Sequence, residues 1–191
     1  VDVYRLNHET GKLKHVDVIR SELESAPRHI KMTKDGKFVY IVHELKNYID
    51  VYSYVEEDGN PFFTKIQNIP TLNDYHAGGS AASALNFSAD EKYLVSSNAG
   101  DNSVIIYRID HKTGFLEKIL CLPISGDYPK DIAIFPDGNH LASINHGSNI
   151  ISFFQVEYKE KLLVMSGRSI SVNEPNCCVI TKVPTRGKKA D

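Results

Sequence analysis

Four side chains suited to a small anionic substrate flank one predicted turn. Arg28 and His29 precede Asp35-Gly36, and His43 and Glu44 follow it at a similar distance. A guanidinium binds a carboxylate or phosphate through two parallel hydrogen bonds. A carboxylate can take a proton from water, and an imidazole can carry one near neutral pH. Arg28 and Glu44 could equally form a structural ion pair, because such pairs also occur in clefts.

The pattern that holds these residues occurs three times along the chain. Segments 27–44, 82–99 and 129–146 each read as a strand, a turn and a second strand, and they recur roughly every 50 residues. The turns are centred on Asp35, Asp90 and Asp137. The matching apolar positions, which we expect in the core, are Ile30, Leu85 and Ile132, then Met32, Phe87 and Ile134. A fourth copy begins at Pro175 and places Cys178 and Ile180 in the same positions.

Each copy continues with two more strands rich in Val, Ile, Tyr and Phe. Four strands in a unit of this length are typical of a β-propeller blade. We therefore predict an all-β protein, a β-propeller of four-stranded antiparallel blades with about half of the ring present. The predicted units are the tail of one blade over 1–19, whole blades over about 20–70, 75–122 and 125–170, and the first strand of a closing blade over 175–183.

Half of a ring leaves two sheet faces open, because each blade buries its faces only against its neighbours. We expect the remaining blades to come from an N-terminal half, a second chain or another copy of this chain. The chain opens on Val1 within a predicted strand, so we also expect further sequence before it.

Composition narrows the function classes. Lys and Arg total 22 against 24 Asp and Glu, a net charge of −2, which argues against a nucleic-acid partner. No apolar run approaches the ~20 residues of a membrane span, so we expect no membrane partner. Three cysteines without ligand spacing predict no metal site, no cofactor and a reducing, cytoplasmic location. Cys177 could be a reactive thiol, whereas Cys178 fits the core.

In a propeller, the first strand of each blade lines the channel and the second runs back antiparallel. Residues at equal distance from the turn therefore meet at one channel mouth. The predicted mouth positions are Arg28 and Glu44, Ser83 and Ala99, Lys130 and His146, with His29, His43, Asn98 and Asp131 one step away. The loop over 73–80 is either a lid that brings His76 to this mouth or a simple connector.

The segment Pro27-Arg-His-Ile, with Asp35-Gly-Lys-Phe and His43-Glu44 after it, resembles the lactonase family of seven-bladed propellers. That family includes 6-phosphogluconolactonases and the 3-carboxymuconate lactonising enzyme. The segments 107–116, 129–131 and 175–179 support the resemblance, which covers nearly the whole chain and corresponds to a C-terminal half. It implies that Arg28 and Glu44 face the substrate.

The resemblance implies a hydrolase of a sugar-acid lactone, similar to 6-phosphogluconolactonase, that binds a small anionic lactone at the mouth. Its implied catalytic residues are Glu44, Arg28 and His29, and its implied substrate-binding residues are His43, Asn98, Lys130, Asp131 and His146. A 3-carboxymuconate-type cycloisomerase and a non-catalytic binding or scaffold module are the alternatives. Ala99 replaces an arginine of the family pattern, which argues against the cycloisomerase, and Ala84 and Ala99 would suit a scaffold.

Overall fold

A computed structural model describes residues 1–76 and 78–181, and this part of the chain contains strands and no helix. A hairpin of β1 (Asp2–Leu6) and β2 (Leu13–Val18) is followed by three antiparallel sheets. The first sheet holds β3 (Pro27–Met32), β4 (Phe38–His43), β5 (Tyr48–Glu57) and β6 (Asn60–Pro70). The second holds β7 (Ala81–Phe87), β8 (Tyr93–Ala99), β9 (Ser103–Ile109) and β10 (Leu116–Pro123). The third holds β11 (Pro129–Ile134), β12 (His140–Asn145), β13 (Ile150–Glu157) and β14 (Leu162–Met165), and β15 (Ile170–Ser171) also pairs with β13.

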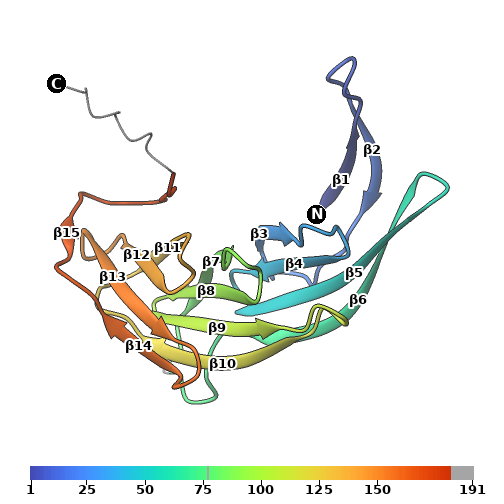
Figure 1. The fold of residues 1–191 in the computed structure, drawn as a ribbon. Helices are drawn as coiled ribbons and strands as arrows, with labels where there is room; N and C mark the ends of the chain where they lie inside the picture. The colour runs from blue at the N-terminus through green and yellow to red at the C-terminus, as the bar shows by residue number, and fades with distance from the viewer. Residues whose placement is uncertain (77, 182–191) are drawn as a thin grey trace, which may run out of the picture.

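The three sheets stand side by side in an open arc (Figure 1), with the N-terminal hairpin at one end and residues 172–181 at the other. The first strands of the sheets, β3, β7 and β11, lie on the concave side of this arc, and β6, β10 and β14 lie on the convex side. The predicted all-β architecture and the half-ring of four-stranded blades are confirmed.

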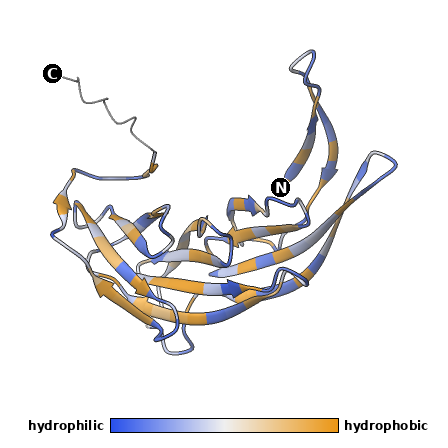
Figure 2. Cartoon of the chain, viewed as in Figure 1, coloured by the Kyte–Doolittle hydropathy of each residue, from blue (hydrophilic) through white to orange (hydrophobic). Residues whose placement is uncertain are grey.

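The core lies between neighbouring sheets. Tyr40 and Val42 of the first sheet pack with Leu85 and Ile105 of the second in one cluster. A second cluster joins the second and third sheets. Because both faces of a central strand are covered, β4 is buried at all of its positions and is an almost continuous apolar run, visible as orange ribbon in Figure 2.

The face of the first sheet that points toward β1 and β2 is only partly covered. Ile30 is 49% exposed and Met32 is 46% exposed, whereas the matching Leu85 is 2% exposed. The prediction of a core position is therefore wrong for Ile30 and Met32 in this structure. The hairpin supplies only two strands on that side, and an open hollow remains between Ile30 and Met32 of β3 and residues 1–4.

Residues 172–181 form no strand, although they lie alongside β11. The backbone N–H of Cys178 donates to Asp131, and a shallow groove is shared by Cys178 and Val179 with Ile132. The predicted closing strand over 175–183 is not formed in residues 175–181, which contact β11 without sheet pairing, and 182–183 lie outside the described residues.

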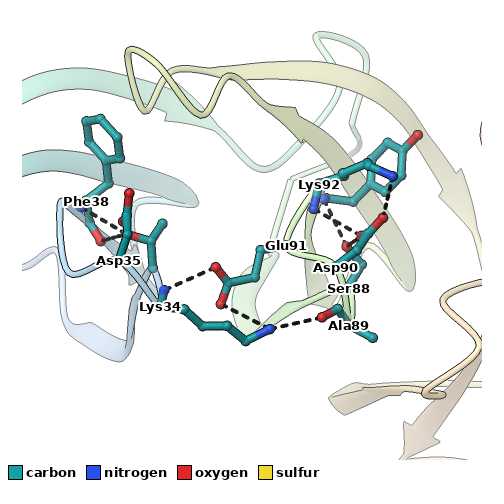
Figure 3. Close-up of polar contacts among 10 residues, drawn as sticks. Lys34, Asp35, Phe38, Ser88, Ala89, Asp90, Glu91 and Lys92 are labelled. Carbon is teal, nitrogen blue, oxygen red and sulfur yellow. Dashed lines mark hydrogen bonds and ion pairs between the residues drawn. The ribbon is translucent and has the colours of Figure 1, made fainter.

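The turn ends of the first two blades are tied together, as Figure 3 shows. Lys34 Nζ donates to the Ala89 carbonyl at 3.0 Å, and the Lys34 backbone N–H donates to Glu91 Oε2 at 3.1 Å. Within the first turn, Thr33 Oγ1 donates to Asp35 Oδ1 at 2.7 Å. This bond, together with the backbone N–H and ammonium of Lys37, lowers the pKa of that carboxyl to about 2. The two Lys34 contacts join the first and second blades at the end opposite the predicted mouth.

Candidate active site

The strand pairing is interrupted at the same place in each blade. The register shifts between Pro27 and His29 in the first blade and between Pro129 and Asp131 in the third. Arg28 and Lys130 are the extra residues of these bulges. A β-bulge turns a side chain out of the ladder, so the local irregularity explains how two cations on inner strands come to project at the predicted mouth.

Arg28 and Glu44 form an ion pair. Arg28 Nη1 donates to Glu44 Oε2 at 2.9 Å, and both side chains are 31% exposed. The Glu44 backbone is fixed on two sides, because its N–H donates to the Ala26 carbonyl and its carbonyl accepts from Ala82 of the next blade. The structural pairing that the sequence allowed is therefore present. A guanidinium has five N–H donors, so this bond leaves part of the fork for an anion.

His29 lies among the same charges. Burial lowers the pKa of its imidazole below the usual 6.5, and the nearby Arg28 guanidinium lowers it further, while the carboxylates of Asp131 and Glu44 act in the opposite direction. The net effect is a lowered pKa, which favours the neutral form of the ring. A neutral imidazole beside an arginine is able to accept a proton from water.

Lys130 and Asp131 connect the third blade to the C-terminal segment. Lys130 Nζ donates to Asn176 Oδ1 at 3.0 Å and lies 5.9 Å from the centroid of the Tyr128 ring. Asp131 Oδ2 accepts from the Cys178 backbone N–H at 3.0 Å. The structure thus places Arg28, His29 and Glu44 of the first blade, and Lys130 and Asp131 of the third, at the same end of the inner strands, opposite the Asp-Gly turns.

His43 and Asn98, predicted to bind substrate at the mouth, are both fully buried. His43 Nδ1 is 2.9 Å from Ser25 Oγ, and Asn98 Nδ2 donates to the Thr71 carbonyl at 2.7 Å. Each side chain therefore ties the end of a second strand to the loop that enters its blade. The expected exposure was wrong for these two residues because they belong to strands covered on both faces.

His146 is partly exposed and lies next to Tyr128, with ring centroids 6.3 Å apart. Its backbone N–H donates to the Tyr128 carbonyl, and its buried Nδ1 has no hydrogen-bond partner among residues 1–76 and 78–181. His76 is exposed, and its Nδ1 is 3.2 Å from the Asn73 carbonyl within its own loop. Neither histidine contacts the Arg28–Glu44 pair through a hydrogen bond in the described structure.

A buried charge at Asp50 was missed by the sequence reasoning. Its side chain is 1% exposed and accepts from Lys65 Nζ and Asn68 Nδ2, each at 2.7 Å, while His43 Nε2 lies 3.4 Å away. Burial acts to raise the pKa of Asp50, but His43, Lys65 and Asn68 outweigh it and lower the pKa to about 2. The sequence did contain a signal for this buried charge, namely a single carboxylate within the otherwise apolar segment 48–52.

Comparison with known proteins identifies the family of this fold. The family model described as lactonase, 7-bladed beta-propeller, matches residues 1–180, and the chain belongs to that family. An uncharacterized protein of Lactococcus lactis subsp. cremoris is 32% identical over 93% of this chain and 51% of its own length. A 6-phosphogluconolactonase of Formosa agariphila is 29% identical over 87% of this chain and 46% of its own length.

Among solved structures, the periplasmic gluconolactonase of Pseudomonas aeruginosa superposes with a TM-score of 0.81 at 24% identity, over 92% of this chain and 49% of that one. This likeness confirms the fold. The chain spans about half the length of the proteins it matches. Among the residues that the structure describes, no helix is long and apolar enough to cross a membrane.

Proposed function

We propose that the protein hydrolyses a sugar-acid lactone and binds it at the mouth end of the inner strands, where Arg28 and His29 of the first blade and Lys130 of the third lie. Family membership and the 6-phosphogluconolactonase of Formosa agariphila support lactone chemistry. The single observation that carries the proposal is the Arg28–Glu44 ion pair beside His29 at the mouth end of the first inner strand. In this proposal His29 accepts a proton and Arg28 binds an anion. Hydrolysis of a phosphorylated or carboxylated lactone requires both functions.

In the proposed reaction, Arg28 and Lys130 bind the substrate anion and set the lactone carbonyl near His29. The imidazole of His29 takes a proton from water as the water oxygen attacks the carbonyl carbon. The tetrahedral intermediate then collapses, the bond to the ring oxygen breaks, and the imidazolium returns the proton to that oxygen. Glu44 orients Arg28 through their ion pair at 2.9 Å, and its charge favours the transient imidazolium.

The pH dependence of turnover follows from the role of His29. Its pKa lies below 6.5, so the ring is in its basic form at pH 7. We expect kcat/KM to be constant around pH 7 and to fall as the pH drops through a single inflection below 6.5. Initial rates of lactone hydrolysis between pH 5 and 8, corrected for the spontaneous rate, measure this. The acid limb should be absent from the residual activity of His29→Gln, and an unchanged limb in that variant would exclude His29 as the base.

Glu44→Gln should keep the fold and lose most of the turnover. The amide still accepts a hydrogen bond from Arg28 but no longer supplies a negative charge beside His29. We expect kcat to fall by about 100-fold, the size of effect typical of a lost charge in acid–base catalysis. Glu117→Gln is the matched control, because Glu117 also pairs with an arginine but is 67% exposed on an outer strand. Full activity of Glu44→Gln would remove Glu44 from the site.

The partners of the site follow from the open faces of the arc. We propose that further propeller blades, from a longer polypeptide or a second chain, cover Ile30 and Met32 and complete the channel. Their exposure and the half-length matches to relatives support this. Assays should therefore use the complete ring. A complete ring that shows no lactone hydrolysis above the spontaneous rate would favour the binding or scaffold alternative.

A further inference from the structure

Two adjacent thiols lie at the mouth and have no part in the proposed hydrolysis. Cys177 is exposed and Cys178 is partly exposed, in the segment that runs alongside β11. The third cysteine, Cys121, is buried in the core between the first two blades. The chain thus carries one accessible pair of neighbouring thiols. The buried thiol of Cys121 serves as an internal reference for them.

The peptide that joins these cysteines is itself bound to the site. Its N–H group, on Cys178, donates to Asp131 Oδ2 at 3.0 Å. The preceding residue, Asn176, accepts a hydrogen bond from Lys130 Nζ at 3.0 Å. Any change in the conformation of the Cys177–Cys178 peptide must therefore act on the carboxylate of Asp131, whose charge in turn acts on His29.

Closing a disulfide between neighbours forces such a change. Adjacent Cα atoms are about 3.8 Å apart, whereas the Cα atoms of ordinary disulfides are about 4.4–6.8 Å apart. The ring can close only if the intervening peptide twists, and the resulting strain makes the bond easier to reduce. We propose that Cys177 and Cys178 form a reversible dithiol–disulfide site that is oxidised by a peroxide, and that closure of the disulfide withdraws the Cys178 N–H from Asp131.

The chemistry balances with hydrogen peroxide as the oxidant. The Cys177 thiolate attacks one peroxide oxygen, an S–O bond forms, the O–O bond breaks, and the departing hydroxide takes up a proton to leave as water. The Cys178 sulfur then attacks the sulfenic sulfur, the S–S bond forms, and the S–O bond breaks to release a second water. The two thiols lose two electrons and two protons, and the peroxide gains both.

The order of attack follows from the surroundings of the two thiols. Burial and the neighbouring Asp131 carboxylate raise the pKa of Cys178, so its thiol stays protonated. Cys177 is the more exposed of the two and meets a dissolved oxidant first. Cys177 is therefore the attacking thiol and Cys178 the resolving one. This thiol chemistry does not depend on the proposed lactone hydrolysis.

The test is oxidation of the purified, fully reduced protein with one equivalent of hydrogen peroxide, followed by alkylation and peptide mass analysis. We expect the peptide with Cys177 and Cys178 to lose the mass of two hydrogen atoms, to resist alkylation and to recover with dithiothreitol. Cys178→Ser should stop at a sulfenic acid on Cys177 that dimedone traps, and Cys177→Ser should form no disulfide. Alkylation of both thiols after oxidation, or a disulfide between chains, would overturn the proposal.

A second measurement tests the link to Asp131. Hydrogen exchange of the Cys178 amide should accelerate about tenfold or more on oxidation, the change expected when a bond to a carboxylate is lost. In Asp131→Ala, the amide should exchange fast in the reduced protein already, and oxidation should add little. An unchanged exchange rate in the oxidised protein, with the disulfide present, would refute the coupling and leave only the thiol chemistry.

Discussion

Arg28→Ala is expected to lower kcat/KM for a phosphorylated sugar lactone by about 100-fold or more, because it removes a charge-assisted, two-pronged contact to the substrate anion. The bulge at Arg28 directs the guanidinium out of the strand ladder, and Glu44 holds it through one bond. Hydrolysis of 6-phosphogluconolactone at pH 7, above its spontaneous rate, is the measurement. The loss should be carried mainly by KM if Arg28 binds the anion equally in the ground and transition states.

Two further variants and a second substrate test whether Arg28 acts by binding the substrate anion. Arg28→Lys should recover only part of the loss, since lysine keeps the charge but not the fork. Arg108→Ala is the matched control, because Arg108 also pairs with a glutamate but is 61% exposed on β9, away from the inner strands. A lactone without phosphate should lose much less than the phosphorylated one in Arg28→Ala. Equal losses for both lactones would show that Arg28 acts on something other than the substrate anion.

The repeat made the fold predictable from sequence. Three strand–turn–strand units, each anchored on an aspartate, fix the period, and the apolar positions on both faces of β4 require neighbours on both sides. The same logic failed at Ile30 and Met32, because a repeat predicts which positions need cover and not whether the cover is present. The open face at β3 is a property of the half-ring, which no single unit encodes.

The candidate site was predictable in part. Counting outward from the turn put Arg28, Glu44 and Lys130 at the turn-distal ends of their hairpins, and the strand register agrees with that position. Their role toward a substrate stays a prediction. Counting could not tell which way a side chain at a strand end points. The bulges send Arg28 and Lys130 outward, whereas His43, on an uninterrupted stretch of β4, turns into the blade and meets Ser25 and Asp50.

Asp50→Asn should lower the free energy of unfolding by about 3 kcal/mol, the effect typical of breaking a buried charge network. The carboxylate is 1% exposed and binds Lys65 and Asn68 at 2.7 Å each. Asparagine keeps the shape but leaves Lys65 without its counter-charge and places an amide next to His43. Urea unfolding at pH 7, followed by far-ultraviolet circular dichroism, measures the difference. Glu117→Gln, which breaks an exposed ion pair, should change stability by less than about 1 kcal/mol.

Unfolding measured at lower pH distinguishes the electrostatic contribution of Asp50 from a packing effect of the substitution. The pKa of Asp50 is lowered from 3.8 in a free carboxyl to about 2 in the folded protein. Folding therefore favours the ionised carboxylate. The stability that this carboxylate contributes, about 2 kcal/mol, is therefore complete above pH 4 and is lost as the pH falls toward 2. The difference between wild type and Asp50→Asn should shrink over that interval. A difference that stays constant down to pH 2 would mean that asparagine disturbs the packing around His43 and that the charge of Asp50 stabilises nothing.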